Sequence, residues 1–399
     1  MSGFDVAVAG GGLVGASLAL ALAGTGRRVV LIEAVAHDSA AQPSFDERTT
    51  ALGNASRRIL SALGVWERAA AQAGVIRTIH VSDAGRFGFA RLSAAEQGIE
   101  AFGYVVPNRV LGAALWARVA ASPHISVRVP AQVQSLTAGA AGVDIALAGG
   151  ERLSAALAVG ADGAASAVRR ASGIGATVRD YHQVAVVANV ATDVAHADTA
   201  YERFTGAGPM ALVPLADGSY TVVWALAPAQ AERCLQLPQA QFLQELQRHF
   251  GWRAGRFIRA GRRAGYPLAL TRAEDTPGER MVLIGNASQS LHPVAGQGFN
   301  LGLRDAAALA EQLAAPGDPG DAQRLQAFAE WRAADRRGVT GFTDALVRLF
   351  GDRRPAVGAV RDLGLLLFDL LPPAKSALAR VSAGFGGRSP RLARGLPLT

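Results

Sequence analysis

The sequence predicts an α/β fold in which a parallel sheet with packed helices is interleaved with an antiparallel sheet and followed by C-terminal helices. Three observations predict it. Residues 4–32 read strand, glycine-rich turn, helix and strand, an order typical of a parallel βαβ unit. Residues 181–226 are rich in strand patterns. From about Gly298 the periodicity is mostly helical.

The N-terminal elements follow from local patterns. Phe4–Ala9 alternates and is partly β-branched, Leu13–Ala23 places apolar and small residues at helical spacing, and Val29–Ile32 is a second apolar strand. Ser56–Leu63 and Val110–Val119 have helical patterns. We therefore expect a βαβ unit followed by two helices.

The later elements predict the second sheet and the last helices. Short strands run from Ile125 to Val159, and Asp217-Gly218 separates two apolar strands as a hairpin turn does. A buried strand over Met281–Ile284 leads into a helix over Gly298–Leu313. These patterns predict three regions, with the following bounds: a discontinuous first domain over 1–75, 100–178 and 272–345, a second domain over 76–99 and 179–271, and a C-terminal helical region over 346–399.

Composition excludes several classes of protein. Half of the 399 residues are apolar and 18% are charged, which excludes a disordered tail or a collagen-like polymer. The net charge of +8 would suit nucleic acid. However, the positive residues are scattered arginines with a single lysine, Lys375, and no aromatic and basic stripe accompanies them. We therefore expect no nucleic-acid partner.

Cysteine and hydropathy patterns indicate a cytoplasmic protein. The one cysteine, Cys234, excludes an internal disulfide framework. Gly10–Gly26 is apolar but lacks a basic segment before it, and polar residues and a proline interrupt Met281–Leu303. Neither segment predicts a membrane span. The six histidines other than His292 show no metal-ligand spacing, so we expect no metal.

The glycine motif predicts a dinucleotide site. Gly10, Gly12 and Gly15 form G-x-G-x-x-G between a predicted strand and helix. The first glycine allows a tight turn, the second lets the backbone approach a pyrophosphate, and the third lets helix and strand pack closely. Glu33 ends the next strand, near the roughly 20-residue spacing of a ribose-binding carboxylate. This pattern leaves FAD and NAD open and is less suited to NADP.

Three further motifs follow in order. They are FDERTTAL at 45–52, ADGAASAVR at 161–169, and LIGNASQSLHPVAGQGFNLGLRD at 283–305. Together they resemble the single-component FAD-dependent aromatic hydroxylases, and most of all the ubiquinone-biosynthesis hydroxylases. The likeness runs from about Phe4 to Leu313.

The resemblance implies a fold and an activity. The first domain would be a Rossmann-like FAD-binding domain of the aromatic hydroxylase type, and the antiparallel second domain would bind substrate. The family uses NAD(P)H as a transient reductant and molecular oxygen as co-substrate. A flavin hydroperoxide then hydroxylates a phenol ring, here a polyprenylated methoxyphenol. The cofactor carries the redox chemistry while the protein positions the ring.

The resemblance also assigns cofactor contacts. Arg48 is a fixed cation suited to the FAD pyrophosphate or the flavin edge. Asp162 would lie near FAD, although an aspartate before glycine is also an ordinary turn residue. Arg109 matches a family arginine that contacts FAD, although a surface position at a helix start explains it nearly as well. Asn286 stands where the family often has aspartate, and its amide can still bind the ribityl chain.

The third motif implies the chemical centre. Pro293 and the Gly296-Gln297-Gly298 turn would bring backbone N–H groups beside the flavin pyrimidine and stabilise negative charge there. His292 would be a polar residue beside the flavin, or a hydrogen-bonded structural group. Asn300 is also expected at the cofactor.

The substrate would meet the antiparallel region. Met210, Leu212 and Pro214 are expected to line the pocket, although packing inside the sheet explains them equally well. The leucine-rich stretch Asp362–Leu371 is either a buried helix or a face that contacts lipid or a partner protein. Lys375 and the arginines after it would support such a face. Peripheral association with the inner membrane face, or a complex with other ubiquinone-biosynthesis proteins, is therefore expected as one alternative.

Two other functions stay open. A hydroxylase of a small soluble aromatic compound would share all the FAD motifs. A flavin-binding assembly component of a biosynthetic complex would also bind FAD but would turn over little substrate.

Overall fold

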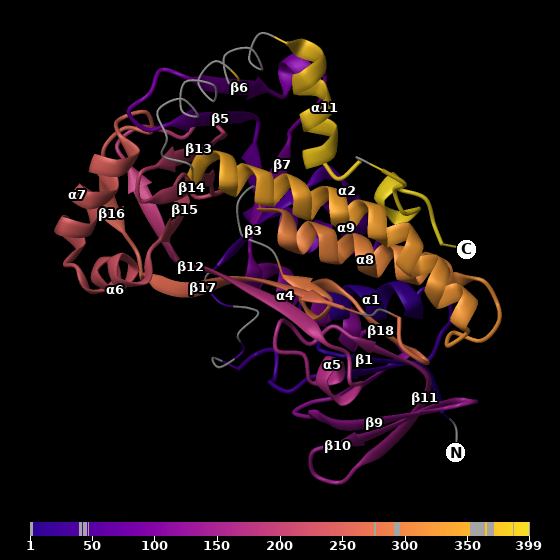
Figure 1. The fold of residues 1–399 in the computed structure, drawn as a ribbon. Helices are drawn as coiled ribbons and strands as arrows, with labels where there is room; N and C mark the ends of the chain where they lie inside the picture. Colours follow the sequence, from indigo (N-terminus) through magenta and orange to yellow (C-terminus); the bar gives the residue numbers. More distant parts are fainter. Residues whose placement is uncertain are drawn as a thin grey trace.

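The computed structural model describes residues 3–39, 42, 46, 48–274, 277–290, 296–351, 364, 371–385 and 387–398. His292 and Pro293 lie outside the described residues, as does most of the stretch from Asp362 to Leu371. The strands that are described form three sheets (Figure 1).

The first sheet carries the N-terminal βαβ unit. Its order is β8-β2-β1-β11-β10-β9, with β18 paired to β11. The central strands run parallel, and β9 and β10 form an antiparallel hairpin at one edge. The bounds are β1 Phe4–Ala9, β2 Val29–Ile32, β8 Ile125–Arg128, β9 Val133–Gly139, β10 Gly142–Leu147, β11 Arg152–Gly160 and β18 Met281–Leu283.

Three helices pack on one face of this sheet: α1 (Leu13–Ala23), α4 (Asn108–Ala120) and α8 (Gln297–Ala314). Val6 of β1 and Leu31 of β2 are fully buried in one cluster with Leu18 and Leu22 of α1. Burying a leucine side chain of this kind contributes roughly 1.5–3 kcal/mol. The expected bounds of the first strand, helix and second strand are confirmed.

The second sheet has nine strands in the described residues. The pairing of β13 with β5 is parallel and the other pairs are antiparallel. Asp217 and Gly218 lie in the turn between β14 and β15, as expected. The bounds are β5 Thr78–Asp83, β6 Phe89–Ser93, β12 Ala176–Thr192, β13 Thr199–Thr205, β14 Gly208–Pro214, β15 Tyr220–Leu226, β16 Phe257–Ala260, β17 Ala264–Ala273 and β19 Gln289–Ser290.

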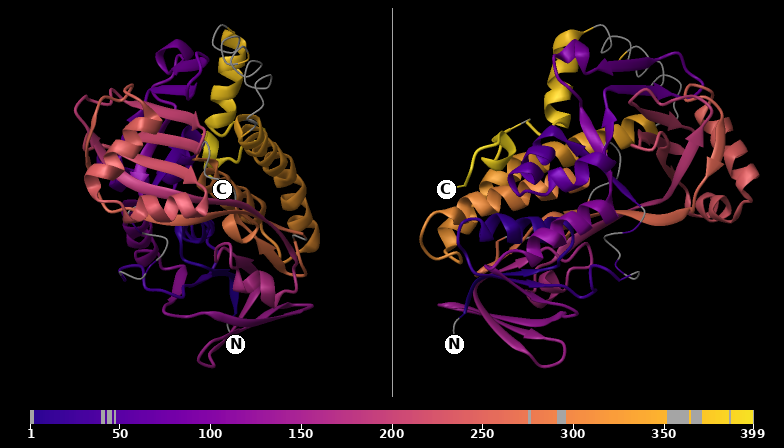
Figure 2. Two further views of the ribbon diagram at one scale, coloured as in Figure 1. Left: turned by 60° about the vertical axis from the view of Figure 1, so that its left-hand side comes forward. Right: turned by 180° about the vertical axis from the view of Figure 1, so that it is seen from behind.

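Helices α6 (Pro228–Gln236) and α7 (Gln239–Phe250) cover one face of the nine-stranded sheet (Figures 1 and 2). Trp224, Phe242 and Phe250 fill that interface and are almost completely buried. The long strands β12 and β17 extend from this sheet toward the first sheet. Both therefore cross the expected domain boundaries at residues 178 and 271.

A small third sheet and further helices complete the fold. The sheet has the order β3-β7-β4. Helix α9 packs along α8, and Figure 2 shows the two running together. The remaining bounds are β3 Thr49–Gly53, β4 Gly74–Ile76, β7 Gly103–Pro107, α2 Asn54–Ala62, α3 Trp66–Ala69, α5 Ala167–Ala171, α9 Ala322–Gly351, α11 Pro372–Ser382, and the short 3₁₀ turns η1 Ala70–Gln72, η2 Ala95–Gln97, η3 Gly285–Ala287 and η5 Leu392–Arg394.

Lys375, which we expected to support a basic surface near the C-terminus, is buried. Lys375 of α11 is 9% exposed, because α11 packs against the core cluster that contains Ile76 and Phe102. Lys375 therefore does not extend a basic surface. No helix in the described ranges combines the length and apolarity that crossing a membrane requires.

Candidate functional site

A cavity of about 1230 Å³ gathers most of the expected cofactor residues. This exceeds the roughly 300–1,000 Å³ of a pocket for one drug-sized ligand. Residues from all three sheets and from the N-termini of α1 and α8 line it. The expected residues among them are Gly10, Gly12, Glu33, Arg48, Asp162, Asn286, Gly296, Gln297, Gly298 and Asn300.

The glycine turn forms one end of the cavity. Gly10 has a φ of +100°, and a Cβ on it would lie 2.5 Å from the carbonyl oxygen of Ala161. Helix α1 begins after Gly12 with no side-chain cap and no acidic residue in its first turn. Its first N–H groups are therefore available to an anion at the cavity. Gly15 lies inside α1 and serves helix packing instead of lining the cavity.

Glu33 holds the turn from the end of β2. Its carboxylate accepts hydrogen bonds from the backbone N–H of Gly11 and of Val35, and it is 9% exposed. Trp116 of α4 donates its indole N–H to the Gly11 carbonyl at 3.0 Å and stacks on His37. Trp116 could not be predicted as a site residue from the sequence, because its spacing in α4 is that of an ordinary core residue.

We expect Glu33→Ala to weaken FAD binding by about tenfold. The substitution leaves the buried N–H of Gly11 unpaired, which destabilises the glycine turn at the cofactor end of the cavity by about 1–3 kcal/mol. Titration of the apoprotein with FAD, followed by flavin fluorescence, measures the dissociation constant. Glu232→Ala on the exposed face of α6 is the matched control. Equal FAD affinity in Glu33→Ala and Glu232→Ala would contradict the role of Glu33.

Arg48 reaches the cavity beside β3. Its Nε donates to Asp46 at 2.8 Å, and its guanidinium lies 4.6 Å from the centroid of the Tyr266 ring. The Tyr266 hydroxyl also donates to Asp46. Burial acts to raise the pKa of Asp46, but the hydrogen bonds from Arg48 and Tyr266 hold that pKa below its ordinary value. The carboxylate thus stays ionised and fixes the arginine.

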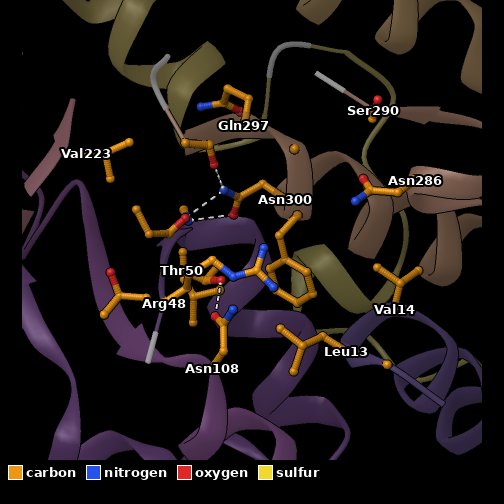
Figure 3. A pocket seen from close by; sticks show the side chains of 18 of the residues that line it. Leu13, Val14, Arg48, Thr50, Asn108, Val223, Asn286, Ser290, Gln297 and Asn300 are labelled. Carbon is orange, nitrogen blue, oxygen red and sulfur yellow. Dashed lines mark hydrogen bonds between the residues drawn. The ribbon is translucent and has the colours of Figure 1, made fainter. Parts of the chain in front are cut away.

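Arg109 lies outside the cavity, which corrects the expectation. It is exposed beside a separate small pocket with Arg68 and Gln72. The preceding residue, Asn108, lines the main cavity and accepts a hydrogen bond from Thr50 at 2.7 Å (Figure 3). Successive helical residues point about 100° apart, so one position along α4 changes the direction of the side chain.

Asn300 acts as a positioning residue. Its Oδ1 accepts from the Gly53 N–H and the Ser56 hydroxyl, and its Nδ2 donates to the carbonyls of Ala51 and Gly296. These four bonds use the ordinary capacity of an amide. Asn300 therefore ties the start of α8 to β3 and α2 at the cavity that it lines.

The start of α8 forms a second uncapped helix end at the cavity. Gly296 precedes it with a φ of +60°, and no side chain caps the helix. A Cβ on Gly298 would meet no atom within 4 Å, so protein packing does not explain this glycine. Open space beside a helix N-terminus suits a ligand with negative charge.

Asp162 and Asn286 differ in how their polar atoms are used. Asp162 accepts from the Ser166 hydroxyl and from the N–H groups of Ala167 and Val168, so it caps α5. Asn286 is exposed to the cavity and makes no hydrogen bond within the described ranges. Its free amide fits a polar cofactor chain. In Figure 3 Asn286 and Val14 lie on one side of the pocket and Val223 on the other.

The expected substrate residues of β14 face away from the cavity. Met210 and Leu212 are fully buried in the cluster under α6 and α7. Successive strand residues point to opposite faces. Ala211 and Val213 therefore line the cavity, whereas Pro214 lies on the same face of β14 as Met210 and Leu212. The expectation that Met210, Leu212 and Pro214 line the pocket is therefore corrected: the residues of β14 that line it are the alternate ones, Ala211 and Val213.

These features together define a flavoprotein-type site: a glycine turn and two uncapped helix ends beside an apolar sheet. The chain matches the FAD binding domain family over residues 3–343. It is 37% identical to the "Ubiquinone hydroxylase UbiL" of Rhodospirillum rubrum over 99% of this chain and 93% of that protein. It is 33% identical to the "3-demethoxyubiquinol 3-hydroxylase" of Escherichia coli, covering 91% and 94%. The chain therefore belongs to the FAD-dependent hydroxylase family that includes these proteins.

Solved structures agree in fold. The chain matches p-nitrophenol 4-monooxygenase PnpA from Pseudomonas putida with a TM-score of 0.81 at 20% identity, over 97% of this chain and 100% of that one. It matches PqsL from Pseudomonas aeruginosa with a TM-score of 0.76 at 21% identity, over 92% and 100%. The expected aromatic-hydroxylase fold is confirmed.

Proposed function

We propose that this FAD-dependent monooxygenase hydroxylates the ring of a polyprenylated methoxyphenol on the route to ubiquinone. The observation that carries the proposal is the cavity, which joins the glycine turn to the apolar face of the nine-stranded sheet. The names of the two curated relatives connect them to ubiquinone and its precursors. The GN…LHPVAGQG pattern also resembles that of the 2-octaprenyl-6-methoxyphenol hydroxylases.

The residues of this chain would divide the work. Bound FAD supplies the redox chemistry that carries electrons from NAD(P)H to molecular oxygen. The start of α1 would hold the pyrophosphate, with Glu33 keeping the turn in place, and Asn286 would bind the ribityl chain. The start of α8, from Gly296 to Gly298, would stabilise negative charge on the flavin. Arg48 would supply a fixed positive charge nearby.

A polyprenyl substrate is favoured over a small aromatic one by the lining of the cavity. Ile79, Leu92, Phe102 and Leu378 extend the apolar lining beyond the cofactor end. A single aromatic ring would leave much of this surface uncovered. Removing it from water favours binding by roughly 25 cal/mol per Å².

Peripheral membrane association is part of the proposal. A polyprenyl chain resides in a membrane, and the leucine-rich stretch that would contact lipid lies mostly outside the described residues. Leu371, at its end, is 52% exposed. Flotation of the holoenzyme with anionic lipid vesicles tests this part. Loss of flotation on removing 362–371 supports the membrane role, whereas no flotation of the intact protein argues against it.

The test of the function is the visible spectrum of the FAD-loaded protein under anaerobic conditions. We expect NADH or NADPH to bleach the flavin, and to bleach it faster with a methoxyphenol that carries a short prenyl tail. Air should then yield hydroxylated product. Equal bleaching and product with a phenol that lacks the tail would favour the small-substrate alternative. Bound flavin that neither nicotinamide reduces would favour an assembly component.

A further inference from the structure

One charged side chain stands in the apolar wall of the cavity. A row of paired residues crosses five strands of the nine-stranded sheet, and every member lines the cavity. The row runs from β6 through β5, β13 and β14 to β15 and consists of Ala90, Val81, Glu202, Ala211 and Val223. Glu202 is its middle member, with apolar neighbours on both adjoining strands.

The alternation of β13 separates Glu202 from its charged neighbours in sequence. Tyr201 and Arg203 point to the other face, where Tyr201 donates to the Arg253 carbonyl and Arg203 to Ser82. Glu202 makes no hydrogen bond or ion pair in the part of the chain that the structure describes. Burial alone raises its pKa to about 7. The Glu202 side chain is half-buried where it lines the cavity. A carboxylate that is partly removed from water without a partner destabilises a fold, so packing does not explain Glu202.

The other charged groups near this wall are placed as follows. On β5, Asp83 pairs with Phe204, two residues beyond the pair of Val81 with Glu202, and forms an ion pair with Arg86. Strand β14 carries no titratable residue. On other elements of the cavity wall, Arg48 is bound to Asp46, and Lys375 is buried on the same helix as Leu378. None of these groups contributes to the altered proton affinity of Glu202.

We propose that Glu202 is the catalytic base that accepts the proton of the substrate's phenol hydroxyl. This inference rests on the proposed function. In the step, the phenol O–H bond breaks, its electron pair stays on the phenol oxygen, and the proton forms a new O–H bond on the Glu202 carboxylate. The phenolate makes the ring more electron-rich for electrophilic oxygen. Glu202 lies outside the glycine motif and the three motifs at 45–52, 161–169 and 283–305.

The decisive variant is Glu202→Gln in the FAD-loaded protein. The matched control is Glu232→Gln, at an exposed position of α6. The first readout is the ultraviolet difference spectrum of the bound prenyl methoxyphenol without reductant. At pH 8 we expect the phenol bound to wild type and Glu232→Gln to show the red-shifted absorption of a hydroxyl that donates to a carboxylate, and the phenol bound to Glu202→Gln to show a smaller shift. No red shift in wild type, or an equal shift in wild type and Glu202→Gln, would overturn the proposal.

The second readout is turnover. General base catalysis contributes about 10²–10⁴-fold, so we expect kcat at pH 8 to fall about 100-fold in Glu202→Gln with little change in KM. Wild-type kcat should rise as the pH passes through about 7, where the Glu202 carboxyl loses its proton, and this rise should be absent in Glu202→Gln. Retention of the rise in Glu202→Gln would overturn the proposal.

A substrate methyl ether separates the base from a general effect on binding. Because the ether has no proton to give, it should bind wild type and Glu202→Gln equally. The red-shifted absorption in wild type without hydroxylated product would contradict the proposed function and leave Glu202 as the partner of the phenol hydroxyl. Hydroxylation by wild type and Glu202→Gln at equal rates would contradict the base and leave the function.

Discussion

Gly15→Ala is expected to abolish FAD binding and to lower the free energy of unfolding by more than about 3 kcal/mol. A methyl group on Gly15 would overlap the carbonyl oxygen of Gly10 and lie 3.2 Å from the Cβ of Ala161. Backbone cannot rotate aside as a flexible side chain can, so α1 would have to move away from the turn. Urea unfolding and FAD titration measure both effects.

Gly338→Ala is the matched control because it adds the same methyl group to a helix. A Cβ on Gly338 of α9 would meet no atom within 4 Å. Alanine favours a helix over glycine by about 1 kcal/mol, so we expect Gly338→Ala to be neutral or slightly stabilising. Comparable stability and FAD affinity in Gly15→Ala and Gly338→Ala would show that α1 can shift without opening the turn.

The βαβ unit could be predicted closely because its signals are local. Phe4–Ala9 and Val29–Ile32 are short apolar runs on either side of a glycine turn and a helix, and their bounds agree with the structure. The G-x-G-x-x-G spacing also fixes chemistry, because each glycine answers a steric demand of the turn. Accordingly, Gly10 and Gly12 lie at the cavity and Gly15 at the helix contact.

The direction of side chains in β14 could not be predicted. Residues 209–215 are apolar throughout, so the strand has no alternation to distinguish its faces. One face packs under α6 and α7, and the other lines the cavity. Which residues meet substrate therefore depends on where those helices dock. The expectation of Met210 and Leu212 failed for this reason.

Glu202 was missed for a related reason. In the sequence it stands between Tyr201 and Arg203, a setting typical of a solvated strand face. The structure pairs β13 with β5, which lies more than 100 residues earlier in the chain and pairs with β6 on its other edge. That long-range pairing encloses Glu202 in the cavity wall, and no local pattern reports it.

The charges between α8 and α9 were also not predicted. Asp305 and Arg332 are completely buried and paired at 2.8 Å, and Arg336 donates to the second oxygen of Asp305. Arg304 and Arg332 both bind Asp335. Three arginines thus share two carboxylates inside the core. The sequence of α8 predicts an apolar helix. The charged partners of its Arg304 and Asp305 lie on the next long helix, α9, so no local pattern indicates the pairing.

Asp305→Asn is expected to lower the free energy of unfolding by about 3–5 kcal/mol, because it leaves Arg332 charged in the core without its buried partner. Urea unfolding of the FAD-loaded protein measures the change. Glu151→Gln is the control, since the pair of Glu151 with Arg128 is largely exposed and such a pair contributes about 0–1 kcal/mol. A change below about 1 kcal/mol in Asp305→Asn would show that Arg332 finds another acceptor.

The same network predicts a pH dependence of stability. Burial acts to raise the pKa of Asp335, but attraction to Arg304 and Arg332 outweighs it, so the folded pKa lies below the ordinary value of 3.8. A lowered folded pKa gives stability that is present above the unfolded pKa and is lost as the pH falls toward the folded one. Asp335→Asn should therefore be less stable than wild type at pH 7, with a gap that narrows below about pH 4. A gap that stays constant from pH 7 to pH 3 would mean that the Asp335 carboxylate contributes through its shape and hydrogen bonds and not through its charge.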